Sequence, residues 1–278
     1  MSKKLIFSVV VVVLVVGAFL AFNKYVPLNN GEQNNMIGAQ DSNPKTDPNK
    51  IEIVPIEHAT MTLKWGDKVI YIDPVGGAIA FSNQPAPDII LLTHTHSDHL
   101  SVKTLEAVAK EKTVIIAPMA VADLLPSTVT GTLLVMKNGE KTNQKTAQKM
   151  NLNGFSVEAV PAYNWPESAD SYHKKGEGNG YILETGDKRV YISGDTADTP
   201  EVRQLKDIDI AFISINLPYT MSVEKAAEAV LEFKPKVVYP YHYRTPDGFS
   251  DVAKFKEIIN SQNPAIEVIQ LEWYPKSY

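Results

Sequence analysis

The pattern of apolar and polar positions divides the chain into three parts. Residues 5–22 are almost continuously apolar, and residues 23–50 are rich in Asn, Gln, Pro, Asp and Gly. The remainder alternates short apolar runs, which predict buried strands, with apolar positions three or four residues apart, which predict helices. We therefore expect an N-terminal hydrophobic segment (1–22), a polar linker (23–50) and one folded domain (51–278).

The N-terminal apolar segment predicts an association with a membrane. Its eighteen residues, 5–22, approach the length that a helix needs to cross a bilayer. We expect residues 1–22 to be an uncleaved anchor, and Val16-Gly17-Ala18 makes a cleaved signal, with a secreted or periplasmic product, the alternative. Two lysines before the segment predict a cytoplasmic N-terminus and an extracytoplasmic domain. The polar linker cannot bury enough surface to become ordered and is expected to be a flexible tether.

The folded domain reads as α/β. Apolar runs predict early strands at 51–56, 61–65, 69–72, 89–92, 113–117 and 133–136, and later strands at 155–160, 180–184, 189–193, 208–213, 237–241 and 266–269. Helical spacing occurs at 101–110, 119–125, 200–205, 223–233 and 251–259. A loop is expected from Asp73 through Gly77. Strands interleaved with amphipathic helices predict sheets covered by helices.

Composition narrows the chemistry. The chain has 278 residues, which is enough for one domain of roughly 200–250 residues with appendages. Its net charge of −5 gives no support to nucleic-acid binding, so we expect no nucleic-acid partner. Because cysteine is absent, a metal site would use His, Asp, Glu, Asn or water.

One short stretch concentrates candidate metal ligands. His94, His96 and His99 are three of the six histidines, and Asp98 directly precedes the third. The stretch joins an apolar strand to a helix that begins after Ser101, and functional residues often lie in such loops. Imidazole and carboxylate are ligands of zinc and similar divalent metals. His94 and His96 can face one ion, and Asp98 and His99 can reach a second; the alternative is a polar loop with capping side chains.

The motif H-x-H-x-D-H after an apolar strand resembles that of the metallo-β-lactamase fold superfamily. His58-Ala59-Thr60 and the run 69–74 resemble the opening of its lactonase-like and phospholipase D-like branch. The run 191–196 resembles the family's Gly-Asp-Thr strand end, and 239–243 resembles its terminal histidine region. These matches follow the family's order from about residue 51 onward. The resemblance implies an αββα four-layer sandwich with a metal site at the sheet edges.

The resemblance also implies a dinuclear site. Its metal ligands would be His94, His96, Asp98, His99, Asp195 and His242. Asp195 would bridge two ions, although by itself it could be a capping aspartate, and His242 could be an ordinary strand-end histidine. Asp98 and His99 would be the catalytic residues, with Asp98 orienting the attacking water or accepting its proton. Two zinc ions are the simplest cofactor, and manganese and iron are alternatives.

The sequence departs from the family at Asn164, where relatives carry a histidine, and an amide is a poor zinc ligand. His173 is the spare histidine nearby, so His173 or Asn164 is a candidate third ligand or substrate contact; an exposed loop histidine is the alternative. His58 is expected beside the site, or else in the core. Asp73 could orient a ligating imidazole through its second nitrogen, or be a turn residue.

These residues predict a metal-dependent hydrolase that cleaves an ester, lactone, amide or phosphodiester bond of a small-molecule substrate. The sequence does not identify the substrate, because one fold hosts many chemistries. Lys174, Lys175 and Arg244 could hold an anionic substrate group or could be solvated. A membrane-tethered, non-catalytic binding or scaffold protein that keeps the fold is the alternative, and Asn164 is the residue that favours it.

Overall fold

The computed structural model describes residues 50–152 and 154–274. The predicted membrane segment (1–22) and residues 23–49 of the predicted linker lie outside the described residues. Within 50–152 and 154–274, no helix is both long enough and apolar enough to span a bilayer.

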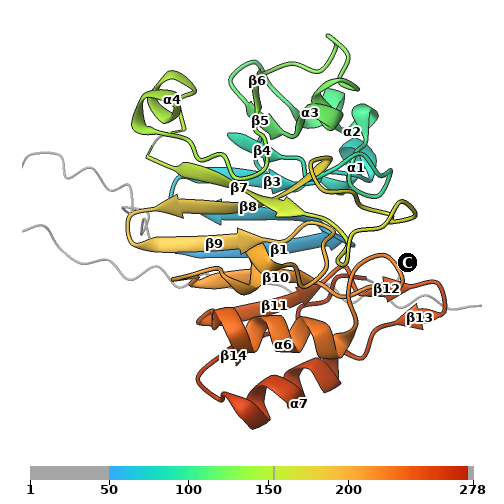
Figure 1. Ribbon diagram of the computed structural model, residues 1–278. Coiled ribbons are helices and arrows are strands. Elements are labelled where there is room, and N and C mark those ends of the chain that lie inside the picture. Colours follow the sequence, from blue (N-terminus) through green and yellow to red (C-terminus); the bar gives the residue numbers. More distant parts are fainter. Residues whose placement is uncertain (1–49, 153, 275–278) are drawn as a thin grey trace, which may run out of the picture. The chain divides into compact units, whose positions relative to one another are not determined.

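Two six-stranded sheets form the centre of the described domain (Figure 1). In spatial order, the first contains β1 (Ile51–Glu57), β2 (Thr60–Trp65), β3 (Lys68–Ile72), β4 (Ile89–Leu91), β5 (Val114–Ala117) and β6 (Thr132–Val135). The second contains β7 (Ser156–Ala162), β8 (Gly178–Thr185), β9 (Lys188–Ile192), β10 (Ile210–Ser214), β11 (Val237–Tyr241) and β14 (Glu267–Val268). In both sheets two antiparallel pairings are followed by three parallel ones. The two halves of the domain therefore repeat one topology.

Helices cover the outer face of each sheet (Figure 1). On the first sheet these are α1 (Gly77–Ala80), α2 (Val102–Val108) and α3 (Met119–Ala122). On the second they are α5 (Pro200–Arg203), α6 (Val223–Phe233) and α7 (Val252–Gln262). The connection between the sheets carries α4 (Gln144–Lys149), and a small hairpin, β12 (Arg244–Thr245) and β13 (Gly248–Phe249), follows β11. The α/β class and the αββα sandwich are confirmed.

Alternation along the strands explains the continuous apolar runs. Ile70 and Ile72 of β3 lie in the core between the sheets, whereas Val69 and Tyr71 pack with the helix layer. Because successive strand side chains point to opposite faces, a strand covered on both sides must be apolar throughout. This packing holds the ends of the central strands in fixed positions, on which the candidate site depends.

Three elements differ from the sequence-based expectation. The loop predicted after Asp73 contains α1, a single turn that begins after Gly76, whose φ of 88° suits glycine. Helix α4 was not predicted, because its sequence has no apolar stripe and no residue of it is buried. The β12–β13 hairpin was also not predicted, since strands of two residues are too short to show a period. The predicted N-cap of α2 is confirmed, because the Ser101 side chain accepts a hydrogen bond from the Thr104 backbone N–H.

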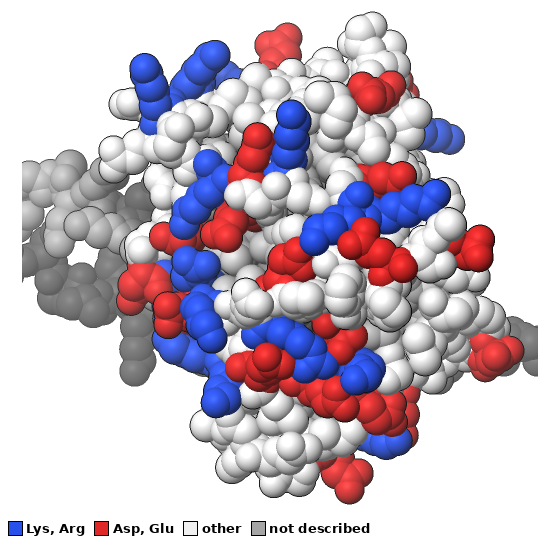
Figure 2. Space-filling model, in the orientation of Figure 1, with Lys and Arg blue, Asp and Glu red and all other residues white. Residues whose placement is uncertain are grey.

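Charges of opposite sign are interspersed over the face shown in Figure 2. Arg203, for example, pairs with Asp198, Glu228 and Glu232. On this face many positive side chains lie beside negative ones, and blue and red side chains alternate over it.

Candidate metal centre

The predicted site residues come together because they follow the carboxyl ends of strands in both sheets. The residues that share this position are His58 after β1, Asp73 after β3, His94 after β4, Asn164 after β7, Asp195 after β9 and His242 after β11. Each sheet's parallel strands end at one edge, and the two edges face the same side of the sandwich. Side chains more than a hundred residues apart in sequence thus converge at one place.

Three overlapping groups of side chains could each hold a metal ion. They are His94, His96 and His173; His94, His99 and Asp195; and Asp98, His99 and His242, with the ligand atoms of each group within 4.8 Å of one another. The groups share His94 and His99, so they form one continuous cluster. It includes every residue that the sequence predicted as a metal ligand, together with His173.

The first group brings three imidazole nitrogens together. His96 Nδ1 lies 3.1 Å from His94 Nε2 and 3.2 Å from His173 Nε2. Two nitrogens bound to one tetrahedral zinc ion, each at about 2.0–2.1 Å, would lie roughly 3.3 Å apart. The spacing therefore fits one ion held by three histidines.

The second and third groups are marked by buried atoms without partners. Asp195 Oδ1 lies 3.5 Å from both His99 Nε2 and His242 Nε2, and none of these three atoms has a hydrogen-bond partner. Asp98 Oδ2 lies 3.3 Å from His242 Nε2 on the same side. Buried polar atoms are nearly always hydrogen-bonded, so atoms left without partners around a common point fit a cation.

Asp195 connects the first group with the other two. Its Oδ1 faces His99 and His242, while its Oδ2 lies 3.5 Å from His173 Nε2. The carboxylate is 4% exposed, so solvent does not replace these neighbours. Its two oxygens are therefore placed as a bridge between two ions would require.

Hydrogen bonds to the far side of three rings set their tautomers. His99 Nδ1 lies 2.7 Å from Asp73 Oδ2, His173 Nδ1 lies 3.1 Å from the Tyr219 carbonyl oxygen, and His94 Nδ1 lies 3.0 Å from Thr93 Oγ1. Each acceptor takes a proton on Nδ1, which leaves Nε2 with a free lone pair toward the cluster. The rings are thus prepared as ligands by their second contacts.

Asp73 has the orienting contact that the sequence predicted. The side chain is fully buried and also accepts hydrogen bonds from Thr93 N at 2.8 Å and from Thr93 Oγ1 at 2.6 Å. Thr93 was not among the predicted site residues, although its place at the strand end directly before His94 was a usable signal. Through Thr93, Asp73 supports His94 as well as His99.

Asn164 contributes to the site by holding a loop. Its Oδ1 accepts a hydrogen bond from His173 N at 2.9 Å, its backbone N–H donates to His173 O at 3.0 Å, and its Nδ2 donates to Tyr219 O at 2.7 Å. The amide is therefore committed to the backbone, and none of the three ligand groups includes it. His173 supplies the imidazole instead. Tyr219 was missed because it lies in a loop with no local pattern.

A cavity of about 340 Å³ opens beside the cluster. Its lining includes His58, Asp98, His242 and Arg244. The ring centroid of His58 lies 5.3 Å from that of His242, so His58 stands next to the site as predicted. Lys175 does not line the cavity, because it pairs with Glu201 at 2.6 Å.

The electrostatics suit metal ligands. Burial lowers the pKa of His94 well below its usual value, and the neighbouring imidazoles lower it further. Burial alone would lower the pKa of His99, but the carboxylates of Asp195 and Asp73 raise it to about 9. Burial raises the pKa of Asp98, but the neighbouring imidazoles of His242 and His99 bring it below its ordinary value. The lowered pKa thus keeps Asp98 ionised, and the carboxylates beside His99 favour a positive charge at its position.

Three residues of the site have left-handed backbones. The φ angles are 51° at His58, 43° at Asp73 and 46° at His242. This conformation costs a residue with a Cβ roughly 1–2 kcal/mol. It ends each strand abruptly and turns the side chain toward the cluster.

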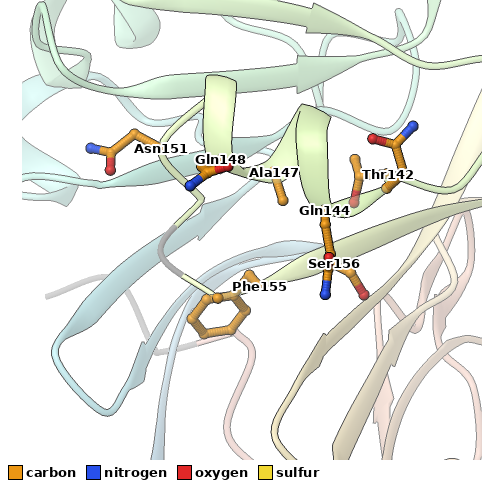
Figure 3. A pocket seen from close by; sticks show the side chains of 9 residues that line it. Thr142, Gln144, Ala147, Gln148, Asn151, Phe155 and Ser156 are labelled. Carbon is orange, nitrogen blue, oxygen red and sulfur yellow. The ribbon is translucent and has the colours of Figure 1, made fainter.

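A larger hollow, of about 520 Å³, lies beside α4 (Figure 3). None of its lining residues has an ionisable side chain: they are Thr142, Asn143, Gln144, Ala147, Gln148, Asn151, Gly154, Phe155 and Ser156. It contains none of the site residues, so the metal cluster is the better candidate for chemistry.

Comparison with known proteins finds one matching family and relatives that are named metal-dependent hydrolases. The family described as "Beta-lactamase superfamily domain" matches residues 52–242. A UPF0173 metal-dependent hydrolase from Thermococcus onnurineus is 30% identical over 210 residues, which cover 72% of this chain and 89% of the relative. Another, from Enterococcus faecalis, is 36% identical over 196 residues, covering 66% of this chain and 75% of the relative.

A solved structure agrees with these matches. A Parabacteroides distasonis protein that carries the name metal-dependent hydrolase is 38% identical, with a TM-score of 0.68, and the match covers 81% of this chain and 94% of that one. The three relatives therefore share one name.

Proposed function

Because the chain belongs to the metallo-β-lactamase fold superfamily, among relatives named metal-dependent hydrolases, we propose that it is a hydrolase that uses two divalent ions. The observation that carries the proposal is the set of unpartnered buried atoms of His99, Asp195 and His242, beside three converging imidazole nitrogens. The proposed ligands are His94, His96 and His173 for one ion, and Asp98, His99 and His242 for the other, with Asp195 between them.

The bound ions would lower the pKa of water toward neutrality and polarise the bond to be cleaved. Asp98 is suited to orient that water and accept its proton, because its carboxylate is 43% exposed in the cavity, and its lowered pKa keeps it in the ionised form that accepts hydrogen bonds. Asp73 holds His99 in position, and Asn164 holds His173. Asp73 and Asn164 thus fix the positions of the ligating histidines, while Asp98 accepts the proton of the attacking water.

Zinc is the simplest proposal for the metal, because the donors are imidazole and carboxylate; manganese and iron are alternatives with the same donor types. The proposed reaction is hydrolysis of an ester, lactone, amide or phosphodiester bond in a small molecule. These bond types share a need for an activated water and a stabilised oxyanion.

Metal analysis and turnover test the proposal together. We expect about two ions per chain by inductively coupled plasma mass spectrometry after dialysis against zinc, and hydrolysis of at least one member of a panel of esters, lactones, amides and phosphodiesters. Chelation should abolish turnover, and zinc should restore it. A chain that binds no metal and hydrolyses nothing would instead be the non-catalytic binding protein.

We also propose that residues 1–22 anchor the protein in a membrane with its hydrolase domain outside the cytoplasm. The support is the almost continuously apolar run and the lysines before it. Cell fractionation should place the protein in the membrane fraction. Protease added to intact cells should degrade its hydrolase domain. Release of the domain, with a new N-terminus near residue 18, would identify a cleaved signal instead.

A further inference from the structure

Arg244 differs from the other arginines of the chain. The sequence contains three, and Arg189 and Arg203 each pair with carboxylates. Arg244 makes no ion pair with any residue in 50–152 or 154–274, and it lines the cavity beside the metal cluster. It is the only Lys or Arg among the residues that line this cavity. An unpaired guanidinium at this place is available to a ligand.

Aromatic rings fix the guanidinium in place. Its central carbon lies 4.5 Å from the ring centroid of Tyr274 and 5.6 Å from that of Phe249. Tyr274 Oη also accepts a hydrogen bond from the Arg244 backbone N–H at 3.1 Å. Stacking uses the faces of the guanidinium and leaves its N–H groups, which point outward in the plane, without carboxylate partners. The group is therefore preorganised for a planar or tetrahedral oxyanion.

A chain of ring contacts connects Arg244 to the metal cluster. The Tyr274 ring lies 5.0 Å from the ring of His58, which in turn lies 5.3 Å from that of His242. The cavity is also lined by Tyr172 and Tyr219, whose rings are 5.0 Å apart. The cavity thus combines a cation, an aromatic wall and the candidate reaction centre in about 340 Å³, a size that suits a small ligand.

Arg244 is a positive group in surroundings that are otherwise negatively charged. The chain carries a net charge of −5, and Asp98 and Asp195 face the same cavity. Of the other two cations considered for this role, Lys174 is not among the residues that line this cavity, and Lys175 is neutralised by Glu201 and hydrogen-bonds to Tyr163. An anionic ligand that enters the cavity would therefore meet Arg244 as its specific protein partner.

We propose that Arg244 binds an anionic group, a carboxylate or a phosphate, of the substrate, and that the protein acts on small organic anions. The inference rests on the proposed hydrolase function, since the anion is assigned to the molecule that is cleaved. The aromatic side chains Tyr172 and Tyr219 would contact the uncharged part of that molecule. Arg244 thereby determines specificity, and it takes no part in bond cleavage.

A matched pair of substrates tests the assignment in the zinc-loaded full chain. Mono-p-nitrophenyl succinate and p-nitrophenyl butyrate have the same leaving group and a similar length, and only the succinate ester carries a carboxylate. We expect wild type to prefer the succinate ester, and Arg244→Gln to lower the ratio of kcat/KM values, succinate over butyrate, about tenfold. Arg244→Lys, which keeps the charge but loses the planar fork, should restore part of the ratio.

Lys256→Gln is the matched control, because Lys256 is an exposed cation on α7, outside the cavity lining. It should leave the ratio unchanged, and metal content should be equal in all variants. If Arg244→Gln has the same ratio as wild type, the assignment is refuted.

A binding measurement separates this inference from the hydrolase proposal. By calorimetry, zinc-loaded wild type should bind phenylacetate more tightly than phenylacetamide, and Arg244→Gln should lose most of that difference. Phenylphosphonate in place of phenylacetate distinguishes a phosphate site from a carboxylate site. Anion binding that depends on Arg244 without any turnover would sink the hydrolase proposal alone, whereas equal binding by wild type and Arg244→Gln would sink the anion site.

Discussion

Replacing Asp73 with asparagine removes one charge from the support of the metal cluster and changes the volume very little. The buried carboxylate accepts hydrogen bonds from His99 Nδ1 at 2.7 Å, from Thr93 Oγ1 at 2.6 Å and from Thr93 N at 2.8 Å. An asparagine side chain has one acceptor oxygen and one NH₂ donor, so it cannot serve all three donors. If its oxygen accepts from Thr93 N, the NH₂ faces His99, and the His99 proton must move to Nε2, the atom that points into the cluster.

The magnitude follows from this mismatch. Removing a partner that orients a ligating histidine typically lowers metal affinity 10–100-fold, which corresponds to about 1.4–2.7 kcal/mol. We expect Asp73→Asn to lie within this range, because His99 either gives up its useful tautomer or leaves a buried donor unpaired. The second possibility costs about 1–3 kcal/mol in the free energy of unfolding.

Competition titration with a chromophoric zinc chelator measures the affinity, and chemical denaturation measures stability with and without metal. Asp209→Asn is the matched control, because Asp209 is also buried and hydrogen-bonds to the Arg189 backbone N–H, but it precedes β10 at the end of the strand away from the site. The control should lose stability and keep its zinc affinity. Equal zinc affinities for wild type and Asp73→Asn would refute the reasoning.

The pH dependence of the metal-free protein gives an independent check. Although burial opposes it, the charges of Asp195 and Asp73 raise the pKa of His99 from 6.5 to about 9. This raised value stabilises the fold fully below pH 6.5, and the contribution is lost as the pH rises through about 9. The difference in unfolding free energy between wild type and Asp73→Asn should therefore be largest at and below neutral pH and should shrink above pH 9.

Three further outcomes are expected. His96→Ala should lose one of the two ions and nearly all turnover, because His96 Nδ1 faces both His94 and His173; unchanged metal content would contradict the assignment. His173→Ala should also release an ion, whereas Asn164→Ala, which only loosens the loop, should keep both ions with weaker affinity for one; identical metal content and turnover in wild type and both variants would make His173 a bystander. A chain shortened to begin at Lys50 should be soluble and show a cooperative thermal transition by circular dichroism, because the core lies within the described domain; aggregation of this chain would count against the boundary.

The strand ends of the site could be predicted from the sequence because each is a local signal. The apolar runs before His94 and Asp195 predict both a strand and the polar side chain at its end. The family resemblance predicts that these strand ends come together at one site. The same logic predicted the orienting role of Asp73. The apolar runs predicted sheets covered by helices, and the family resemblance supplied the αββα sandwich.

Contacts that depend on loop conformation could not be predicted. Nothing in the sequence near Asn164 indicates that its amide binds the backbone of His173, since that depends on the path of the eight residues between them. Tyr219 lines the cavity from a loop, and Tyr274 stacks on Arg244 from a segment without periodicity. Helix α4 has too few apolar positions for any pattern to indicate it.

The left-handed backbones at His58, Asp73 and His242 have a consequence for protein engineering. Glycine adopts this conformation without the steric penalty, so at these three positions a substitution that removes the functional side chain also relaxes the main chain. A library selected only for heat resistance would therefore tend to accumulate glycine where the chemistry resides. The result would be thermostable variants whose metal centre no longer functions. Each round of selection should therefore also screen for bound metal.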